Sequence, residues 1–360
     1  AMIDRILRIL AINPGSTSTK IAVFDNEECR FEETICHSSD ELHACGSIIG
    51  QKDMRSGHIA RALKENGVEP GSIHAVVGRC GLVKPIESGT YAINSAMIAD
   101  LMRPHAKEHA AVLGALIADD LGHCWNVPAF VVDPVVVDEM EPCAKLSGLA
   151  GIERRSVFHA LNTKSVVRKA AASLGIAYED GRFIAVHMGG GITVSAHRYG
   201  RVIDVNDAMG GDGPFTPDRS GSLPVGPIID MCFSGEYTYE QMREFISQKG
   251  GVQSYLGTND MREVETMIKQ GDEFAALVTD AMACQICKDI GAMFVVLDGR
   301  ANAIVLTGGI AHSTRFTALI KKRVDTLAPV LTYAGENEMQ ALAEGGLRAL
   351  RDPKQLLTYL

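Results

Sequence analysis

The residues best suited to chemistry stand in a short turn, residues 13–20, between two apolar runs. The turn holds four consecutive hydroxyl side chains at positions 16–19, a glycine at Gly15 and a cation at Lys20. A loop so rich in hydrogen-bond donors suits the oxygens of a phosphoryl group better than it suits a plain hairpin. It is not a Walker loop, because G-x-x-x-x-G-K-[ST] is absent and a strand-like run follows in place of a helix. An ordinary polar hairpin stays the alternative.

Two glycine turns in the second half of the chain strengthen the phosphate interpretation. Positions 189–191 are three consecutive glycines, whose bare backbone N–H groups can approach a polyphosphate closely. A dinucleotide fingerprint is excluded, since Val194 occupies its last glycine position. Gly308 and Gly309 follow an apolar run and precede a helix-like segment, an arrangement at which nucleotides often bind. Because the turns 13–20 and 189–191 each open one half of the chain, they indicate an internal duplication.

Two arginines supply positive charge near these turns. Arg79 directly follows the predicted strand 73–78, and Arg219 lies in a glycine-rich loop that begins at Gly210. Loops at the ends of regular elements are where binding and catalytic residues concentrate. A surface salt bridge is the alternative for each arginine.

The elements that must hold these residues follow from the apolar pattern. In the first half we predict strands at 6–12, 20–25, 30–36, 73–78 and 128–133, and helices at 55–66 and 95–121. In the second half we predict strands at 183–188, 191–197, 200–205 and 303–306, and helices at 159–174, 225–233, 238–247, 272–297, 313–328 and about 338–351. A hairpin and third strand, followed by helices and parallel strands, imply a mixed α/β sheet with helices on its faces.

The composition limits the classes of function. With 360 residues, 46% of them hydrophobic and 22% charged, the chain is long enough for two ordinary globular domains. A net charge of −9 argues against nucleic acid or an anionic membrane as the main partner. We find no signal peptide and no apolar run near the roughly 20 residues that a transmembrane helix needs. Nine scattered cysteines suit free thiols in a reducing compartment, so we expect a cytoplasmic protein.

The chain resembles a known superfamily at its turns. Residues 13–20, 186–191 and 306–309 are similar to those of the acetate and sugar kinase, heat-shock chaperone and actin superfamily. Within it, further blocks look like butyrate kinases, which are short-chain fatty acid kinases of the acetokinase family. These blocks are residues 77–86, 158–162, 212–221 and 335–345.

The resemblance implies an α/β fold of two duplicated domains, actin-like and ribonuclease H-like, with mixed sheets, helices on both faces and the nucleotide in the inter-domain cleft. It puts the N-terminal domain at 1–150, with a C-terminal helix of about 338–360 packing back on it, and the nucleotide-binding domain at 151–337. It implies direct in-line transfer of the γ-phosphoryl group of ATP to butyrate, reversibly, giving butyryl phosphate and ADP. It also implies Mg²⁺ and a homodimer.

This chemistry would give the cations a task. A fatty-acid carboxylate has a pKa near that of Glu, about 4.3, so it is ionised at neutral pH and needs no general base. The obstacle is to bring one anion against another, and cations must neutralise both and hold them in line. By the resemblance, Arg79 and Arg219 flank the transferring group, while His159 and His187 donate hydrogen bonds to its oxygens. A satisfied buried histidine is the alternative for each histidine.

The resemblance also assigns the remaining candidates. Asp133 would help to hold Mg²⁺ through water and orient an arginine, and Glu338 would also contact the metal, a sparse pair of carboxylates that suits Mg²⁺. The residues expected at the γ-phosphate are Asn13, Ser16, Ser18 and Lys20; those at the β-phosphate are Gly189, Gly190 and Gly191; those at the adenosine are Asp260, Arg262, Gly308 and Gly309.

Departures from acetate kinases bear on the acid. Residues 160–163 read Ala-Leu-Asn-Thr, roughly as in butyrate kinases, where acetate kinases carry a glycine and a further histidine. Gly81 stands where acetate kinases carry a bulky aliphatic residue, so we expect room for extra methylenes, each worth about 0.8 kcal/mol when buried. Because one methylene discriminates weakly, isobutyrate and acetate stay alternatives. Cys80 stands where we expect glycine in butyrate kinases, and an exposed thiol there would make the enzyme sensitive to alkylation or oxidation.

Two other functions stay open. An actin-type, ATP-switched binding protein would close on ATP without a carboxylate, although such a switch has no need for two arginines that receive a second anion. A sugar kinase is a rival within the same class, and it would release ADP in response to a sugar.

Overall fold

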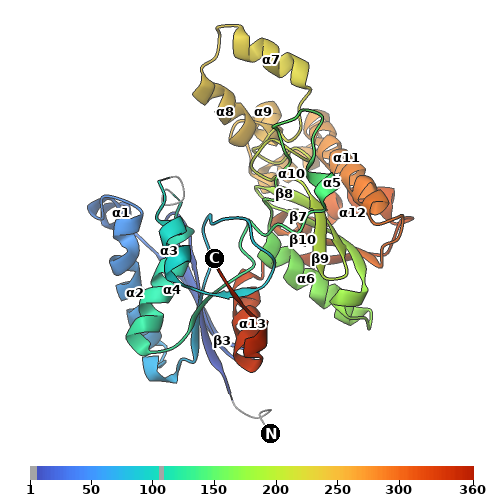
Figure 1. The fold of residues 1–360 in the computed structure, drawn as a ribbon. Coiled ribbons are helices and arrows are strands. Elements are labelled where there is room, and N and C mark those ends of the chain that lie inside the picture. The colour runs from blue at the N-terminus through green and yellow to red at the C-terminus, as the bar shows by residue number, and fades with distance from the viewer. Residues whose placement is uncertain (1–5, 105–108) are drawn as a thin grey trace. The chain divides into compact units, whose positions relative to one another are not determined.

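The computed structural model describes residues 6–104 and 109–360, and the chain divides into two compact units (Figure 1). Unit one comprises residues 1–137 and 337–360, and unit two comprises residues 138–336. Each unit contains one mixed β-sheet with helices packed on it. The expected α/β class with two mixed sheets is confirmed.

The sheet of unit one has the strand order β12-β5-β6-β4-β1-β2-β3. β1, β4 and β6 are parallel, and β2 and β3 continue from β1 as an antiparallel meander. Residues 9–12 of β1 are fully buried because helices cover both faces of the sheet. The strands are β1 Arg8–Pro14, β2 Ser18–Asp25, β3 Glu28–Cys36, β4 Ala75–Gly78, β5 Thr90–Ala92, β6 Ala129–Val132 and β12 Leu356–Thr358.

Helices α4 and α13 cover opposite faces of this sheet. A Cβ added to Gly78 in β4 would lie 2.1 Å from the carbonyl oxygen of Gly114 in α4. A Cβ added to Gly346 in α13 would lie 2.6 Å from Cγ2 of Val77, the neighbouring residue of β4. Adjacent strand residues point to opposite faces, so the two helices lie on different sides. The helices of unit one are α1 Ser39–Ala44, α2 Lys52–Glu65, α3 Ser95–Leu101, α4 Val112–Trp125 and α13 Glu338–Arg351.

The sheet of unit two repeats the core of the first sheet. Its order β11-β10-β7-β8-β9 has the same strand directions as β6-β4-β1-β2-β3 in unit one. This repetition agrees with the duplication that the two turns indicate. The strands are β7 Arg182–Met188, β8 Ile192–Arg198, β9 Arg201–Val205, β10 Ala303–Gly308 and β11 Val330–Ala334.

Two apolar cores lie on the faces of the second sheet. α6 shares one core with Ala185 and Val305, and α11 and α12 share the other with Val186 and Leu306. The helices of unit two are α5 Pro142–Lys145, α6 Ala160–Ser173, α7 Val225–Phe233, α8 Tyr239–Ser247, α9 Gly251–Leu256, α10 Met261–Lys269, α11 Glu273–Val296 and α12 Thr314–Val324.

Several predicted elements need correction. The helix predicted at 95–121 is two helices, α3 and α4, and its residues 105–108 lie outside the described residues. The last helix ends at Arg351, since Pro353 disfavours its continuation, and the chain then adds β12 beside β5 instead of staying helical to 360. β5, β11 and β12 are absent from the sequence prediction, because strands of three to five residues carry too little alternation to be recognised.

Candidate functional site

Unit one gathers candidate residues at the carboxyl ends of three parallel strands. Asn13 lies near the end of β1, Arg79 directly follows β4, and Asp133 directly follows β6. The register pairs Ile12 with Gly78, and β6 continues the parallel pairing beside β4. In α/β sheets this edge is where ligands bind. The structure therefore brings three predicted residues, far apart in the sequence, to one edge of the sheet.

The carboxylate of Glu338 joins two of these residues. Glu338 is the first residue of α13 and is 8% exposed. Its Oε2 accepts a hydrogen bond from Asn13 Nδ2 at 2.7 Å and another from Arg79 Nη1 at 2.6 Å. The ion pair directs the guanidinium group, because a charge-assisted bond is short and strongly oriented. Glu338 thus positions both partners.

Close packing of α4 fixes the backbone at Arg79. The N–H of Arg79 donates to the carbonyl of Ile12 at 2.8 Å. A Cβ added to Gly114 would lie 2.2 Å from the carbonyl oxygen of Arg79, so only glycine allows this approach. Sequence reasoning missed Gly114. The available signal was a glycine inside a helical pattern, which costs about 1 kcal/mol relative to alanine and so points to a packing reason.

Asp133 is held in a conformation that is rare for a residue with a side chain. Its φ is 39°, and it is 3% exposed. Its Oδ1 accepts hydrogen bonds from the Ser88 hydroxyl at 2.6 Å and from the Gly89 N–H at 2.8 Å, which hold the carboxylate in place. Ser88 was not singled out from the sequence. No contact between Asp133 and Arg79 is found among the described residues, so orientation of an arginine by Asp133 stays a prediction.

The turn 13–20 is a hairpin turn between β1 and β2, paired in register from Arg8 with Asp25 to Pro14 with Thr19. The side chain of Ser16 is exposed and that of Ser18 is half-buried. Lys20 Nζ lies 2.7 Å from Glu32 Oε1 on β3. A contact between Lys20 and a phosphate would therefore require this ion pair to open.

In unit two, the two predicted histidines stack on each other. The rings of His159 and His187 are 3.7 Å apart between centroids and inclined by 9°. His159 directly precedes α6, and its Nδ1 lies 3.2 Å from the hydroxyl of Thr193. His187 lies near the end of β7, paired in register with Thr307 of β10. The two side chains therefore lie against each other at the carboxyl edge of this sheet.

Asn162 in α6 orients the ring of His187. Its Nδ2 lies 2.9 Å from His187 Nδ1 and donates to the Thr307 hydroxyl at 3.1 Å. Because the amide nitrogen is a donor, His187 Nδ1 is an acceptor, and the neutral ring carries its proton on Nε2. His187 Nε2 lies 3.2 Å from Glu336 Oε1 without a hydrogen bond between them, and His187 is 1% exposed. From the sequence, Asn162 was part of a block that resembles butyrate kinases, but nothing in its surroundings predicts this contact with His187.

The three-glycine turn meets Arg219 and His159. Arg219 Nη1 donates to the carbonyl of Ala208 at 2.7 Å. A Cβ added to Gly191 would lie 2.7 Å from Arg219 Nη1 and 3.2 Å from His159 Cε1. A side chain at position 191 would therefore displace both groups. The structure brings together the turn, the arginine and the histidine pair.

The glycines at 308 and 309 have different surroundings. Gly308 has a φ of 89°, and a Cβ there would lie 2.3 Å from the carbonyl oxygen of Met188, so glycine alone fits. Gly309 faces open space, with nothing within 4 Å of an added Cβ.

Asp260 and Arg262 form a local pair. Asp260 caps α10 by accepting the N–H of Arg262 at 2.9 Å, and its carboxylate lies 3.0 Å from Arg262 Nη2. The Arg262 side chain is 93% exposed. Among the described residues no contact joins this pair to the histidine cluster, so its role at the adenosine stays a prediction.

The donor set suits a magnesium ion that is held mainly by phosphates and water. No group of three or more His, Cys, Asp or Glu side chains able to hold a metal is found within residues 6–104 and 109–360. Asp133 and Glu338 each engage one carboxylate oxygen in the hydrogen bonds described above. Mg²⁺ typically takes one or two carboxylates and keeps several waters, so these two residues fit it.

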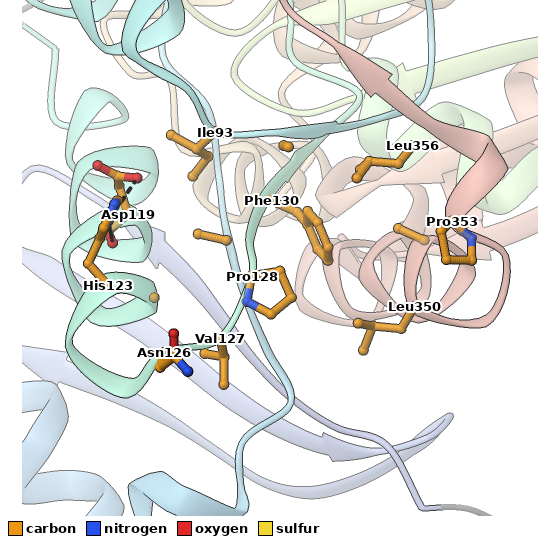
Figure 2. A pocket seen from close by; sticks show the side chains of 14 residues that line it. Ile93, Asp119, His123, Asn126, Val127, Pro128, Phe130, Leu350, Pro353 and Leu356 are labelled. Atoms are coloured by element: carbon orange, nitrogen blue, oxygen red, sulfur yellow. Dashed lines mark hydrogen bonds and ion pairs between the residues drawn. The ribbon is translucent and has the colours of Figure 1, made fainter.

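Unit one also contains a pocket of about 580 Å³ (Figure 2). Its wall includes Pro128 and Phe130 at the start of β6, Asp119 and His123 of α4, and Leu350 of α13. The start of β6 is the amino end of the strand, whereas Asp133 follows its carboxyl end. The pocket contains none of the predicted site residues and is not part of the candidate site.

The expectation that Gly81 leaves room for a longer acid is wrong. A Cβ added to Gly81 would lie 3.0 Å from Cα of Val112 and 3.3 Å from Cδ2 of Leu101. The space beside this glycine is filled by the start of α4 and by α3. Gly81 therefore serves helix packing and gives no information on the length of the acid.

We predict that Cys80 resists alkylation in the folded protein. Cys80 is 3% exposed, and burial raises the pKa of its thiol to about 12, so almost no thiolate exists at pH 8. Brief treatment with iodoacetamide followed by peptide mass spectrometry should modify the exposed Cys124 and Cys232 and spare Cys80. Urea should abolish the difference. Equal labelling of Cys80 and Cys124 in the native protein would contradict this burial.

Comparison with known proteins identifies the family of the chain. Residues 145–349, more than half of the chain, match the acetokinase family. None of the helices in the described part of the chain combines the length and apolarity needed to cross a membrane.

Solved structures with the same fold include three acyl kinases. An acetate kinase from Porphyromonas gingivalis has a TM-score of 0.79 at 19% identity, covering 96% of this chain and 100% of that one. An acetate kinase from Entamoeba histolytica has a TM-score of 0.78 at 16% identity, with 96% and 100% covered. A propionate kinase from Francisella tularensis has a TM-score of 0.74 at 18% identity, with 94% and 99% covered. At these identities the similarity shows the shared actin-like fold and does not identify the acid.

Proposed function

Because the chain belongs to the acetokinase family of ATP-dependent carboxylate phosphotransferases, we propose that it transfers the γ-phosphoryl group of ATP to a short-chain fatty acid, with butyrate preferred. A carboxylate oxygen forms the new bond to the γ-phosphorus while the bond to the β–γ bridging oxygen breaks. The products are ADP and an acyl phosphate. The same groups serve the reverse reaction, since the acyl phosphate is itself a phosphoryl donor.

The observation that carries the proposal is the buried, unbonded Nε2 of His187. This atom makes no hydrogen bond among the described residues, although Glu336 Oε1 lies 3.2 Å away, and a buried polar atom without a hydrogen bond is costly unless a ligand completes it. It lies in the cluster that also holds His159, Arg219 and the turn 189–191. A γ-phosphoryl oxygen supplies the missing acceptor, and the N–H then stabilises the charge on that group.

Each cation has a task in this scheme. The carboxylate arrives ionised, so repulsion between two anions is the barrier that the protein must lower. Arg79, directed by Glu338, and Arg219, held by Ala208, neutralise the two anions and hold them in line. In this scheme the turn 13–20 acts on the γ-phosphate and the turn 189–191 on the β-phosphate.

Asp133 and Glu338 would hold Mg²⁺, in part through water. The ion neutralises charge on the β- and γ-phosphates when bound. In the protein itself, hydrogen bonds from Ser88 and Gly89 hold the Asp133 carboxylate in place.

The choice of butyrate rests on the residues that resemble butyrate kinases, above all Ala160, Leu161 and Asn162 at the start of α6. Isobutyrate, propionate and acetate are the alternatives.

A substrate panel tests the proposal. The protein is incubated with MgATP, hydroxylamine and one of acetate, propionate, butyrate, isobutyrate or hexanoate, and hydroxamate and ADP are measured. We expect equal amounts of both products and the highest kcat/KM for butyrate. ADP release without hydroxamate would instead favour an ATP-switched binding protein, and release that depends on glucose or glycerol would favour a sugar kinase.

The proposed partner in solution is a second copy of the chain. Large apolar side chains are exposed on unit two, among them Val225 and Phe233 of α7 and Leu277 of α11, at 71%, 86% and 62%. Such side chains favour a protein interface over water. Light scattering on a sizing column should give twice the chain mass of 38.6 kDa, and a monomer at micromolar concentration would contradict the dimer.

A further inference from the structure

Arg55 of α2 is a fully buried arginine beneath the turn 13–20. Its exposure is 0%, and its guanidinium group donates to the carbonyl oxygens of Gly15 at 2.9 Å, Ser18 at 2.8 Å and Ser16 at 3.1 Å. The same group donates to the Thr19 hydroxyl at 3.0 Å and to Gln51 Oε1 at 2.8 Å. The Thr19 hydroxyl, which the sequence offered as a donor to phosphate, therefore faces the interior.

These bonds turn the carbonyl oxygens of the turn away from its outer side. Arg55 donates hydrogen bonds to three of the four carbonyl oxygens at positions 15–18. The N–H of His37 donates to the fourth, that of Thr17, at 2.9 Å. The backbone N–H groups of Ser16 and Thr17 donate to no other described residue, and both side chains are exposed. A turn whose acceptors are all engaged and whose donors point outward suits an anion.

Among the described residues, no anionic side chain pairs with Arg55. No carboxylate of the described residues lies within 4.0 Å of its guanidinium group, and all its hydrogen-bond partners are neutral oxygens. Burial lowers the pKa of Arg55, which reflects the cost of keeping this cation out of water. Arginines are rarely buried without a paired anion. A phosphate on the turn would offset that cost.

We propose that Arg55 is a positioning residue for ATP: it holds the turn 13–20 in its donor-outward form and sets a positive charge beneath the γ-phosphate. The inference rests on the proposed function, in which this turn meets the γ-phosphate and the turn 189–191 meets the β-phosphate. Arg55 should therefore affect ATP and leave ADP unaffected.

The test compares the affinities of wild type and variants for the imido analogue of ATP and for ADP, both with Mg²⁺, by calorimetry. Arg55→Lys keeps a cation but loses the planar fork that reaches three carbonyls. We expect the Kd for the analogue to rise about tenfold or more, as for loss of hydrogen bonds to a charged group, with the Kd for ADP changed less than about twofold. Arg61→Gln is the matched control, since Arg61 is an exposed arginine of the same helix.

A second variant keeps Arg55 itself. Gln51→Glu sets a carboxylate against the guanidinium at the position where Gln51 Oε1 now lies 2.8 Å away. The new ion pair should preserve folding while it neutralises the buried charge, so the analogue should again bind more weakly and ADP should not. This variant decides the question if Arg55→Lys fails to fold.

The two proposals can fail separately. If the wild type forms hydroxamate but both variants keep the ratio of analogue to ADP affinity, the role of Arg55 is wrong and the kinase proposal stands. A lower ratio of analogue affinity to ADP affinity in the variants, together with no hydroxamate from any acid, would instead support the proposed role of Arg55. It would refute a carboxylate as the phosphoryl acceptor. An equal loss of analogue and ADP affinity would show a merely structural role for Arg55.

Discussion

Arg219→Ala should lower kcat for hydroxamate formation by about 100- to 1000-fold, the range seen when one donor to a transition-state oxyanion is removed. The Arg219 guanidinium donates to the carbonyl of Ala208 and lies 4.0 Å from the Asp218 carboxylate, and its Nη1 lies where it would meet any side chain at Gly191. The guanidinium group is therefore fixed next to the turn expected at the β-phosphate. Steady-state kinetics with MgATP and butyrate measure the effect.

Folding should be almost unaffected by this substitution. The Arg219 side chain is 30% exposed, so its removal leaves no cavity in the apolar core. The thermal midpoint should stay within about 2 °C of wild type, as for most surface substitutions. Arg323→Ala is the matched control, because Arg323 is an arginine of unit two that pairs with Asp280 on α11 at 2.9 Å and has no role at the site. Near-normal turnover of Arg219→Ala would refute the role of this arginine.

Glu338→Gln should lower kcat by about 100-fold and raise the concentration of Mg²⁺ needed for half-maximal rate. Glutamine keeps the shape of the side chain and one acceptor oxygen, but it removes the charge that pairs with Arg79 and would face the metal. Arg79 then loses its fixed direction, and the hydrogen bond from Asn13 becomes an ordinary neutral one. Titration of the rate with Mg²⁺ at saturating ATP and butyrate measures both effects.

The control for Glu338→Gln is a substitution on the same helix. Glu344→Gln removes one charge from α13 at a half-buried position and should leave both kcat and the Mg²⁺ requirement unchanged. Glu338→Asp should recover part of the rate, since it restores the charge on a shorter side chain. If Glu338→Gln shows wild-type kinetics, the carboxylate neither positions Arg79 for catalysis nor serves the metal.

The sequence was sufficient to locate the residues that stand directly after buried strands. Arg79, Asp133 and His187 follow or end apolar runs, and parallel strands bring such positions to one edge of a sheet. The glycine turns were visible for the same reason, because an apolar run on each side frames them. These patterns depend only on neighbours in the chain, so they can be recognised without a structure.

The residues that support the site could not be found in this way. Asn162, Gly114 and Arg55 act through partners tens of residues away, and no local pattern marks such a pair. Gly81 shows the opposite error: a small residue was interpreted as space for a ligand, although the backbone of α4 fills that space. A glycine in a sequence does not show whether a ligand or the protein itself fills the space beside it.

The proposed transfer requires the turn 13–20, Arg79, His187 and Arg219 to act on the terminal phosphoryl group of ATP. A crystal structure with MgADP, aluminium fluoride and butyrate measures this most directly, because the fluoride complex mimics the group in transfer. We expect a planar aluminium fluoride within hydrogen-bond distance of the turn 13–20, Arg79, His187 and Arg219, with a butyrate oxygen in line. An aluminium fluoride group that touches neither the turn 13–20 nor Arg79, or a butyrate bound far from it, would refute the proposed transfer.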